Sequence, residues 1–143
     1  MTSEIAHSKY YHTSKFNLYV SKSSIINSGD GIFTNDFIKA DTFIDLYMGK
    51  YVEHLVGGEY FFRIDENGGI NSIDLPRCYM AMLNDASYRP TSKRKLRKFI
   101  DHDYKNNCIF KVDVINKKIE IHSLVDIQIG EELFISYGCE YWS

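Results

Sequence analysis

The sequence has little cysteine, proline and tryptophan, and it has no long apolar run. Its 143 residues include three cysteines, two prolines and one tryptophan. The cysteines are odd in number, widely spaced and without a CxxC pair, so neither a disulfide framework nor a structural zinc site is indicated. We expect free thiols, buried or half-buried, in a reducing compartment.

An excess of charge of one sign is also lacking. The formal net charge is -2, which argues against a protein whose whole surface is built to hold nucleic acid. No apolar stretch approaches the length of a membrane span, and residues 1–16 lack the apolar core of a signal peptide. We therefore expect an intracellular protein without membrane contact, in either nucleus or cytoplasm. His54, His102 and His122 lack ligand spacing, so we expect no metal site.

Aromatic residues, in contrast, are plentiful. Eleven tyrosines and nine phenylalanines bring the aromatic fraction to 15%, which suggests that some tyrosines do more than fill a core. The chain also ends on SYGCEYWS, with Tyr137, Tyr141 and Trp142 close together. Chain ends are usually polar and poorly ordered, so these aromatics call for a specific role.

Most of the chain predicts short β-strands in a single domain. The length suits one domain with its own core, and we expect it to span residues 16–143 after a flexible N-terminal tail, 1–15. Alternating and β-branched runs predict strands within 18–26, 32–38, 42–56 and 59–65. Residues 108–124 predict a hairpin that turns near Asn116–Lys117.

Helical signal is sparse. Pro76 fits a helix start before residues 77–86, with Met80 and Leu83 facing inward. Residues 91–100 predict a second short helix, capped by Thr91 or Ser92.

Short polar and aromatic motifs lie between or at the ends of these elements. They are NSGDGIF (27–33), LYMGKYV (46–52), EYFFRID (59–65), LNDA (83–86), KNNC (105–108) and GEELFISYGCEYW (130–142). Each alone has an ordinary structural explanation, since glycines serve turns and asparagines serve caps. The two glutamates 131 and 132 would point to opposite faces of a strand, so structural hydrogen bonding is favoured over a paired acid–base role.

Taken in this order, the motifs resemble the SET domain, the catalytic fold of protein lysine methyltransferases. The resemblance covers about residues 18–142. Family motifs match Gly29 and Gly31 (GxG), Tyr47 and Gly49 (Tyr-x-Gly), Tyr60, Phe62 and Ile73–Asp74, Asn84 (Asn-His-Ser), Asn107 before Cys108, and the closing Gly130–Leu133 with Tyr137–Gly138. The resemblance implies a mostly β fold of several small sheets with short helices and a knot-like C-terminal threading.

The resemblance also implies a cofactor, S-adenosylmethionine, and a set of site residues. Cofactor contacts are implied for Gly29, Asp30, Gly31, Ile32, Phe33, Tyr60, Asn84, Asp85, Asn107 and Tyr137. Tyr137 would be the catalytic tyrosine, and Tyr47 and Tyr141 would line the channel for the substrate lysine. A channel of aromatic rings suits this reaction, because burial and the neighbouring sulfonium lower the pKa of the lysine amine toward its neutral, nucleophilic form.

The chain departs from the family at the Asn-His-Ser motif and just after it. Asp85 and Ala86 stand where the family has His and Ser, so an inactive SET-fold protein-binding module is the alternative reading. A basic insertion follows at about 87–105. Its residues 89–98 form a solvated face, contact nucleic acid weakly or contact an acidic substrate. The protein substrate, histone or other, stays open. It also stays open whether the second subunit of a homodimer or the N-terminal tail covers the channel.

The implied role of Tyr137 leads to a first prediction. Tyr137→Phe removes only the hydroxyl next to the transferring methyl, so it should preserve cofactor binding and lower methyl transfer by orders of magnitude. Calorimetry and a methyl-transfer assay measure the two effects separately. An unchanged transfer rate would remove Tyr137 from this role.

Overall fold

The computed structural model describes residues 9–26, 28–54, 59–90, 96–98 and 104–136. Within these ranges nearly all regular structure is β-strand, as predicted. The elements are β1 (Tyr10–Tyr11), β2 (Leu18–Lys22), β3 (Asp30–Thr34), β4 (Phe43–Leu46), β5 (Lys50–Val52), β6 (Phe61–Asp65), β7 (Gly68–Asn71), β8 (Arg77–Cys78), the 3₁₀ helix η1 (Tyr79–Met82), β9 (Tyr88–Pro90), β10 (Leu96–Lys98), β11 (Cys108–Asp113) and β12 (Lys118–Ser123).

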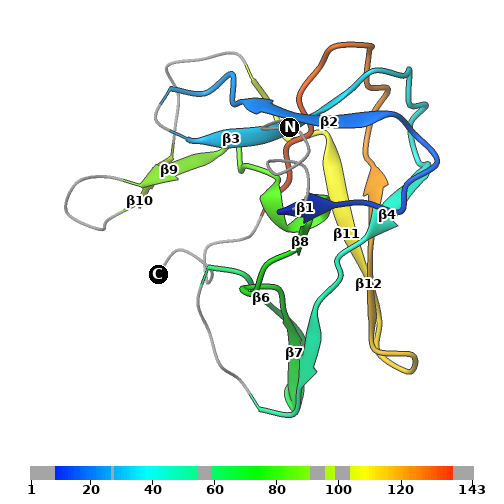
Figure 1. Cartoon of the computed structure of the whole chain (residues 1–143), viewed down its shortest axis with the longest axis vertical. Coiled ribbons are helices and arrows are strands. Elements are labelled where there is room, and N and C mark those ends of the chain that lie inside the picture. The colour runs from blue at the N-terminus through cyan, green and yellow to red at the C-terminus, as the bar shows by residue number, and fades with distance from the viewer. Residues whose placement is uncertain (1–8, 27, 55–58, 91–95, 99–103, 137–143) are drawn as a thin grey trace.

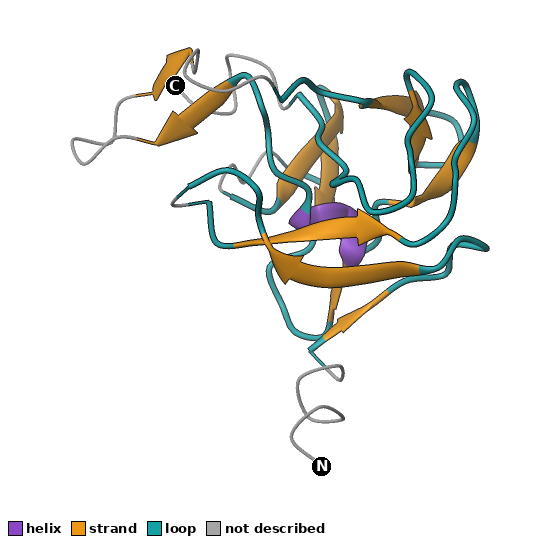
Figure 2. Ribbon diagram, turned by 90° about the horizontal axis from the view of Figure 1, so that it is seen from above, coloured by secondary structure: helices purple, strands orange, loops and turns teal. Residues whose placement is uncertain are grey.

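Three small antiparallel sheets form the body of the molecule. They are the pair β2–β3, the sheet β11–β12–β4 and the sheet β5–β7–β6. In Figure 1 the first lies across the top, the second runs down the right side, and β6 and β7 lie at the bottom. Figure 2 shows the helix η1 in the middle of these strands, where its residues Met80 and Ala81 are buried.

The sheets share one apolar core made largely of isoleucine. Core side chains with no more than 1% of their surface exposed include Ile32, Ile38, Ile44, Met80, Ile119, Ile121, Ile127, Leu133 and Ile135. Each buried aliphatic side chain of this size contributes about 1.5–3 kcal/mol to folding. Ile64 in β6 and Ile70 in β7 belong to the same core cluster, so all three sheets contribute to one core and depend on one another.

The predicted hairpin at 108–124 is confirmed. Strands β11 and β12 pair from Cys108↔Ser123 to Asp113↔Lys118, and the turn residue Lys117 has a positive φ of 53°. The inward alternation weakens toward the turn, since Val112 is 40% exposed. On β12 the alternation holds up to the turn, because Ile119, the partner of Val112, is fully buried.

Residues 132–135 hold the separate sheets together. The amide of Leu133 donates to the Ile32 carbonyl at 2.8 Å, and that of Ile135 donates to the Asn84 carbonyl at 2.9 Å. The Cys108 amide donates to the Phe134 carbonyl at 2.9 Å. This segment thus lies between β3, residue 84 and β11. The knot-like threading predicted for the C-terminus depends on residues 137–143, which lie outside the described residues.

The prediction of a helix over 77–86 is wrong in extent. Arg77 and Cys78 are extended because they pair with β1, and the Arg77 amide donates to the Lys9 carbonyl at 2.8 Å. The helix is limited to η1 and ends at Leu83, which is extended. Tertiary pairing on both sides therefore overrides local helix propensity. Met80 and Leu83 do face the core, as predicted.

The prediction of a helix over 91–100 is also wrong at residues 96–98. These residues form β10, which pairs antiparallel with β9. A helix would have placed Lys93 near Arg97 and Arg94 near Lys98, four residues apart on one face. Like charges at this spacing destabilise a helix.

The N-terminal segment is ordered earlier than the expected boundary at residue 16. Tyr10 and Tyr11 form β1, which runs parallel to β8. The Thr13 amide and hydroxyl both donate to the carboxylate of Asp45, the amide at 2.9 Å. Asp45 is 1% exposed, and a buried carboxylate needs such donors. The chain from Lys9 onward is therefore part of the fold.

Two of the three cysteines are buried free thiols, as predicted. Cys78 and Cys108 are free and buried, and burial raises the pKa of the Cys108 thiol far above its usual value. Cys139 lies outside the described residues. None of the helices in the described part of the chain is long and apolar enough to cross a membrane.

The contact between Thr13 and Asp45 leads to a second prediction. Thr13→Val keeps the shape of the side chain but leaves the buried carboxylate with one donor fewer, so the free energy of unfolding should fall by about 1–3 kcal/mol. Thr42→Val is the control, because among the described residues the Thr42 hydroxyl donates to the Ala40 carbonyl alone, at 3.4 Å. Urea unfolding measures both. Equal effects of the two substitutions would contradict the role of Thr13.

Candidate functional site

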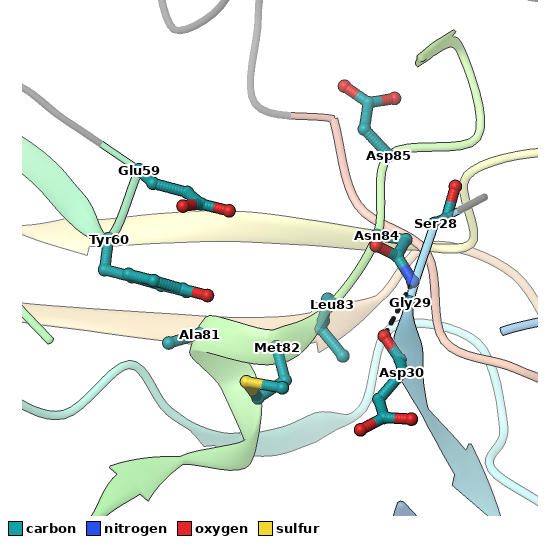
Figure 3. A pocket seen from close by; sticks show the side chains of 10 residues that line it. All are labelled: Ser28, Gly29, Asp30, Glu59, Tyr60, Ala81, Met82, Leu83, Asn84 and Asp85. Atoms are coloured by element: carbon teal, nitrogen blue, oxygen red, sulfur yellow. Dashed lines mark hydrogen bonds between the residues drawn. The ribbon is translucent and has the colours of Figure 1, made fainter. Parts of the chain in front are cut away.

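A pocket of about 250 Å³ lies where three distant segments of the chain meet (Figure 3). One segment is the end of the β2–β3 turn, the second immediately precedes β6, and the third runs from η1 toward β9. The lining residues are Ser28, Gly29, Asp30, Glu59, Tyr60, Ala81, Met82, Leu83, Asn84 and Asp85. This volume is the space between these residues.

Gly29 provides an open stretch of backbone at the edge of the pocket. Its φ of 64° is a left-handed value that glycine adopts without strain. A Cβ at this position would meet nothing within 4 Å, so the requirement is one of backbone conformation. The turn is closed by the Ser23 amide, which donates to the Gly29 carbonyl at 2.8 Å.

Gly31 serves a different purpose. It is buried in β3, and a Cβ there would overlap the carboxylate of Glu132. That carboxylate cannot simply move aside, because it accepts hydrogen bonds from Ser23 and Ser24. The GxG motif thus has one glycine for conformation and one for space.

Asn84 presents an acceptor to the pocket. Its Nδ2 donates to the Asp30 carbonyl at 3.1 Å and to Glu132 Oε2 at 3.2 Å. A carbonyl and a carboxylate are both acceptors, so only the amide nitrogen can face them. In Figure 3 this nitrogen points at Asp30 while the amide oxygen points away from it. Within the described part of the chain Oδ1 has no hydrogen bond, so it is available to a donor on a ligand.

Glu132 supports the pocket from behind. Its side chain is 4% exposed and accepts from the Ser23 hydroxyl at 2.8 Å and the Ser24 amide at 2.7 Å, besides Asn84. Its neighbour Glu131 is exposed, and within the described residues its carboxylate accepts from the Gln128 amide alone, at 2.6 Å. The prediction that the two glutamates face opposite ways and bond structurally is confirmed.

Tyr60 supplies a phenol at the opposite wall. The side chain is half-buried, and the Arg77 guanidinium lies 3.7 Å from the centre of its ring. Burial raises the pKa of Tyr60 above its ordinary value, and the charge of Glu59 adds to this while Arg77 opposes it. The hydroxyl therefore stays protonated at neutral pH and can donate a hydrogen bond.

The pocket has an acidic character. Its described lining includes three carboxylates, those of Asp30, Glu59 and Asp85, and neither lysine nor arginine. In a partly enclosed site such charges favour a cationic ligand.

Asp85, which replaces the family's histidine, closes the base of the insertion. Its Oδ1 accepts from the Ser87 amide at 2.8 Å and from Asn106 Nδ2 at 3.0 Å. The Asn106 oxygen in turn accepts from the Ala86 amide at 2.8 Å. Residues 85–87 are therefore joined to Asn106 across the whole insertion, and the Asp85 side chain serves this junction.

Tyr47 does not line the pocket. It is 3% exposed and belongs to the core, and its ring packs against Phe62 and Phe110 at centroid distances of 5.7 and 6.3 Å. The Tyr47 hydroxyl donates to the Tyr60 carbonyl at 2.6 Å. Among the described residues, Tyr47 therefore supports the wall that carries Tyr60.

Asn107 also lies away from this pocket. Its Nδ2 donates to the Glu132 carbonyl at 2.9 Å and its oxygen accepts from the Phe134 amide at 2.8 Å. The side chain thus anchors the C-terminal segment. Asn107 lines a different cavity, of about 440 Å³, together with Tyr104 and Glu131.

The remaining predicted site residues fall into two groups. Gly31, Ile32 and Phe33 are buried in β3 behind the pocket. Tyr137 and Tyr141 lie outside the described residues. Of the predicted set, the structure therefore brings together Gly29, Asp30, Tyr60, Asn84 and Asp85.

Sequence reasoning missed Ser28, Glu59 and the stretch 81–83 as lining residues. Glu59 and Tyr60 both precede β6, so the alternation of a strand does not direct them to opposite faces. The position of Glu59 next to Tyr60 in the sequence was the available signal. Residues 81–83 directly precede Asn84 in the sequence, so their place beside it was accessible from the motif. In the described part of the chain, no three His, Cys, Asp or Glu side chains are grouped so as to hold a metal ion.

The two glycines lead to a third prediction. Gly31→Ala forces apart Gly31 and the Glu132 carboxylate, so the free energy of unfolding should fall by about 1–3 kcal/mol. Gly29→Asn is the matched control, because asparagine tolerates positive φ and the space there is open; its cost should stay below about 1 kcal/mol. Urea unfolding of both variants checks this. A smaller cost for Gly31→Ala than for Gly29→Asn would contradict the assignment.

The chain is similar to histone-lysine methyltransferases in sequence. It is 30% identical over 132 residues to a putative histone-lysine N-methyltransferase 1 of Plasmodium falciparum, covering 87% of this chain and 2% of that protein. It is 30% identical over 122 residues to the histone-lysine N-methyltransferase set1 of Dictyostelium discoideum, covering 75% of this chain and 7% of that protein. The chain therefore spans a small part of the length of these relatives.

The fold is similar to that of KRYPTONITE, whose crystal structure was solved in complex with mCHG DNA and SAH. The TM-score is 0.65 at 19% sequence identity, over 87% of this chain and 24% of that one. This agreement confirms the predicted fold class. The SET-domain family model matches residues 29–138, which is most of the sequence, and the chain therefore belongs to the SET-domain family.

Proposed function

We propose that this chain is a protein-lysine N-methyltransferase that uses S-adenosylmethionine. The observation that carries the proposal is the pocket shared by Gly29, Asp30, Tyr60, Asn84 and Asp85. These residues come from three segments that are distant in sequence, and they are residues to which the family motifs assign the cofactor. Membership of the SET-domain family and the names of the relatives support the same reaction.

The chemistry of the pocket fits this cofactor. S-adenosylmethionine carries a sulfonium and an ammonium group, and both suit a wall with three carboxylates. The free Oδ1 of Asn84 suits a donor such as the ammonium group. The protonated hydroxyl of Tyr60 can donate to an acceptor on the ligand. When bound, the cofactor supplies a methyl group activated by its sulfonium.

The chain's own residues then bind, orient and exclude water. Gly29 leaves the backbone bare for close approach, and Asn84 and Tyr60 present an acceptor and a donor at opposite walls. Tyr47 holds the Tyr60 backbone through its hydroxyl. Tyr137 and Tyr141 remain the proposed catalytic and channel residues, since an aromatic channel would desolvate the substrate amine and lower its pKa.

The alternative is an inactive SET-fold protein-binding module. Asp85 and Ala86 are the reason to consider it, because the family's His and Ser are absent. Both residues are nevertheless well accommodated: Asp85 bonds to Ser87 and Asn106, and Ala86 is 2% exposed and packs with Ile25 and Phe134. The replacements therefore give no reason to expect a damaged pocket.

We propose a protein lysine as the substrate, and a histone lysine as the first to test, because the relatives are named for that activity. The basic insertion is a candidate for contact with nucleic acid. Residues 89–98 carry six lysine and arginine residues, whose positive charge would attract phosphate groups. The homodimer considered from the sequence stays a prediction.

The fourth prediction concerns binding and transfer. Calorimetry with S-adenosylmethionine should show one site per chain, and the protein should then methylate a component of a histone mixture. Asn84→Ala should weaken binding by at least about tenfold. Asn35→Ala, in an exposed loop after β3, is the control and should leave binding unchanged.

Two outcomes would change the proposal. Absence of cofactor binding at millimolar concentration would exclude the enzyme. Binding without transfer to histones or to a proteome extract would favour the binding module.

A further inference from the structure

The buried carboxylate of Glu132 touches both sides of the pocket without lining it. Its Oε2 accepts from the Ser23 hydroxyl, which belongs to the turn that carries Gly29, and from the Asn84 amide. Its Oε1 accepts from the Ser24 amide at 2.7 Å. With 4% of the residue exposed, this carboxylate bonds to protein donors rather than to solvent.

The carboxylate determines which atom Asn84 offers to a ligand. An asparagine amide can present either its oxygen or its nitrogen, according to its neighbours. Here Nδ2 is held between Glu132 Oε2 and the Asp30 carbonyl, so Oδ1 is left for the pocket. Replacing the carboxylate by an amide would remove this constraint, because an amide can also donate to Oδ1.

The same carboxylate limits where the turn can lie. Gly31 passes so close to it that even a methyl group would overlap. The Ser23 amide also donates to the Gly29 carbonyl at 2.8 Å, so the residue that bonds to Glu132 closes the turn as well. Asp30, whose carbonyl accepts a hydrogen bond from Asn84, lies between Gly29 and Gly31. Its position therefore depends on Glu132 through both neighbouring residues.

We propose that Glu132 is a positioning residue of the cofactor site, which fixes Asn84 with its oxygen toward the ammonium group of the ligand. The inference rests on the proposed function. Glu132 thereby sets the selectivity for the amino-acid arm of the cofactor without touching the cofactor. The acidic wall of Asp30, Glu59 and Asp85 favours the ammonium over the neutral donors of the adenosine portion.

Two thioether probes separate positioning from general stability. S-adenosylhomocysteine carries the amino-acid arm, and 5′-methylthioadenosine has the same nucleoside without it. Glu132→Gln, in the full chain, should weaken binding of the first by about ten- to hundredfold and of the second by less than about twofold. In an Asn84→Ala background, Glu132→Gln should change the ratio of the two affinities by less than about twofold, because the two residues act as one unit.

Glu131→Gln is the matched control. It removes the neighbouring carboxylate, which is exposed and, in the described part of the chain, bonded to the Gln128 amide alone, and it should leave both affinities unchanged. If Glu132→Gln does not fold, Ser23→Ala removes one hydrogen bond and no charge. Ser23→Ala should weaken the binding of S-adenosylhomocysteine by about threefold and leave the affinity for 5′-methylthioadenosine unchanged.

The outcomes are distinct. Equal loss of affinity for both probes, or no loss for either, overturns the role of Glu132 while leaving the proposed function in place. Failure of the unsubstituted protein to bind S-adenosylhomocysteine overturns the proposed function itself. The inference is supported if Glu132→Gln lowers the affinity for S-adenosylhomocysteine alone and if this loss does not occur in the Asn84→Ala background.

Discussion

The structure depends on the position of residues 132–135 between three other parts of the chain. Their backbone bonds to Ile32 in β3, to Asn84 after η1 and to Cys108 in β11 at 2.8–2.9 Å. Asn107 adds two side-chain bonds to the same segment. The small sheets make few contacts with one another through strand pairing alone, so this segment and the isoleucine core join them. Loosening it would release the GxG strand and the asparagine motif together.

The pocket follows from that arrangement. The segment that pairs with β3 carries Glu132, and its carboxylate faces the one position in β3 where a side chain would not fit, Gly31. The same carboxylate bonds to Asn84. This one group therefore requires a glycine at position 31 and also sets which atom of the Asn84 amide faces the pocket. Two residues of the sequence motifs, Gly31 and Asn107, thus act behind the pocket, whereas Gly29 and Asn84 act in it.

The structural features that could be predicted from the sequence are those that local sequence patterns determine. The hairpin at 108–124 was found because alternation and the Asn116–Lys117 turn are both local signals. The helix at 77–86 was wrong because β8 pairs with β1, which is far away in the sequence, and the helix at 91–100 was wrong at residues 96–98 because these residues pair with β9. For the site, motif resemblance located Gly29, Tyr60 and Asn84. It could not show that the hydroxyl of Tyr47 is used by the Tyr60 carbonyl, or that Asp85 closes the insertion with Asn106.

A crystal structure of the protein with S-adenosylhomocysteine tests the central claim most directly. The account predicts the ligand against Gly29, Tyr60 and residues 82–85, with its ammonium group within hydrogen-bond distance of Asn84 Oδ1 and with Asn84 Nδ2 still bonded to Glu132. A ligand seated instead in the cavity beside Tyr104 and Asn107, or one that meets Asn84 through its nitrogen, would contradict it.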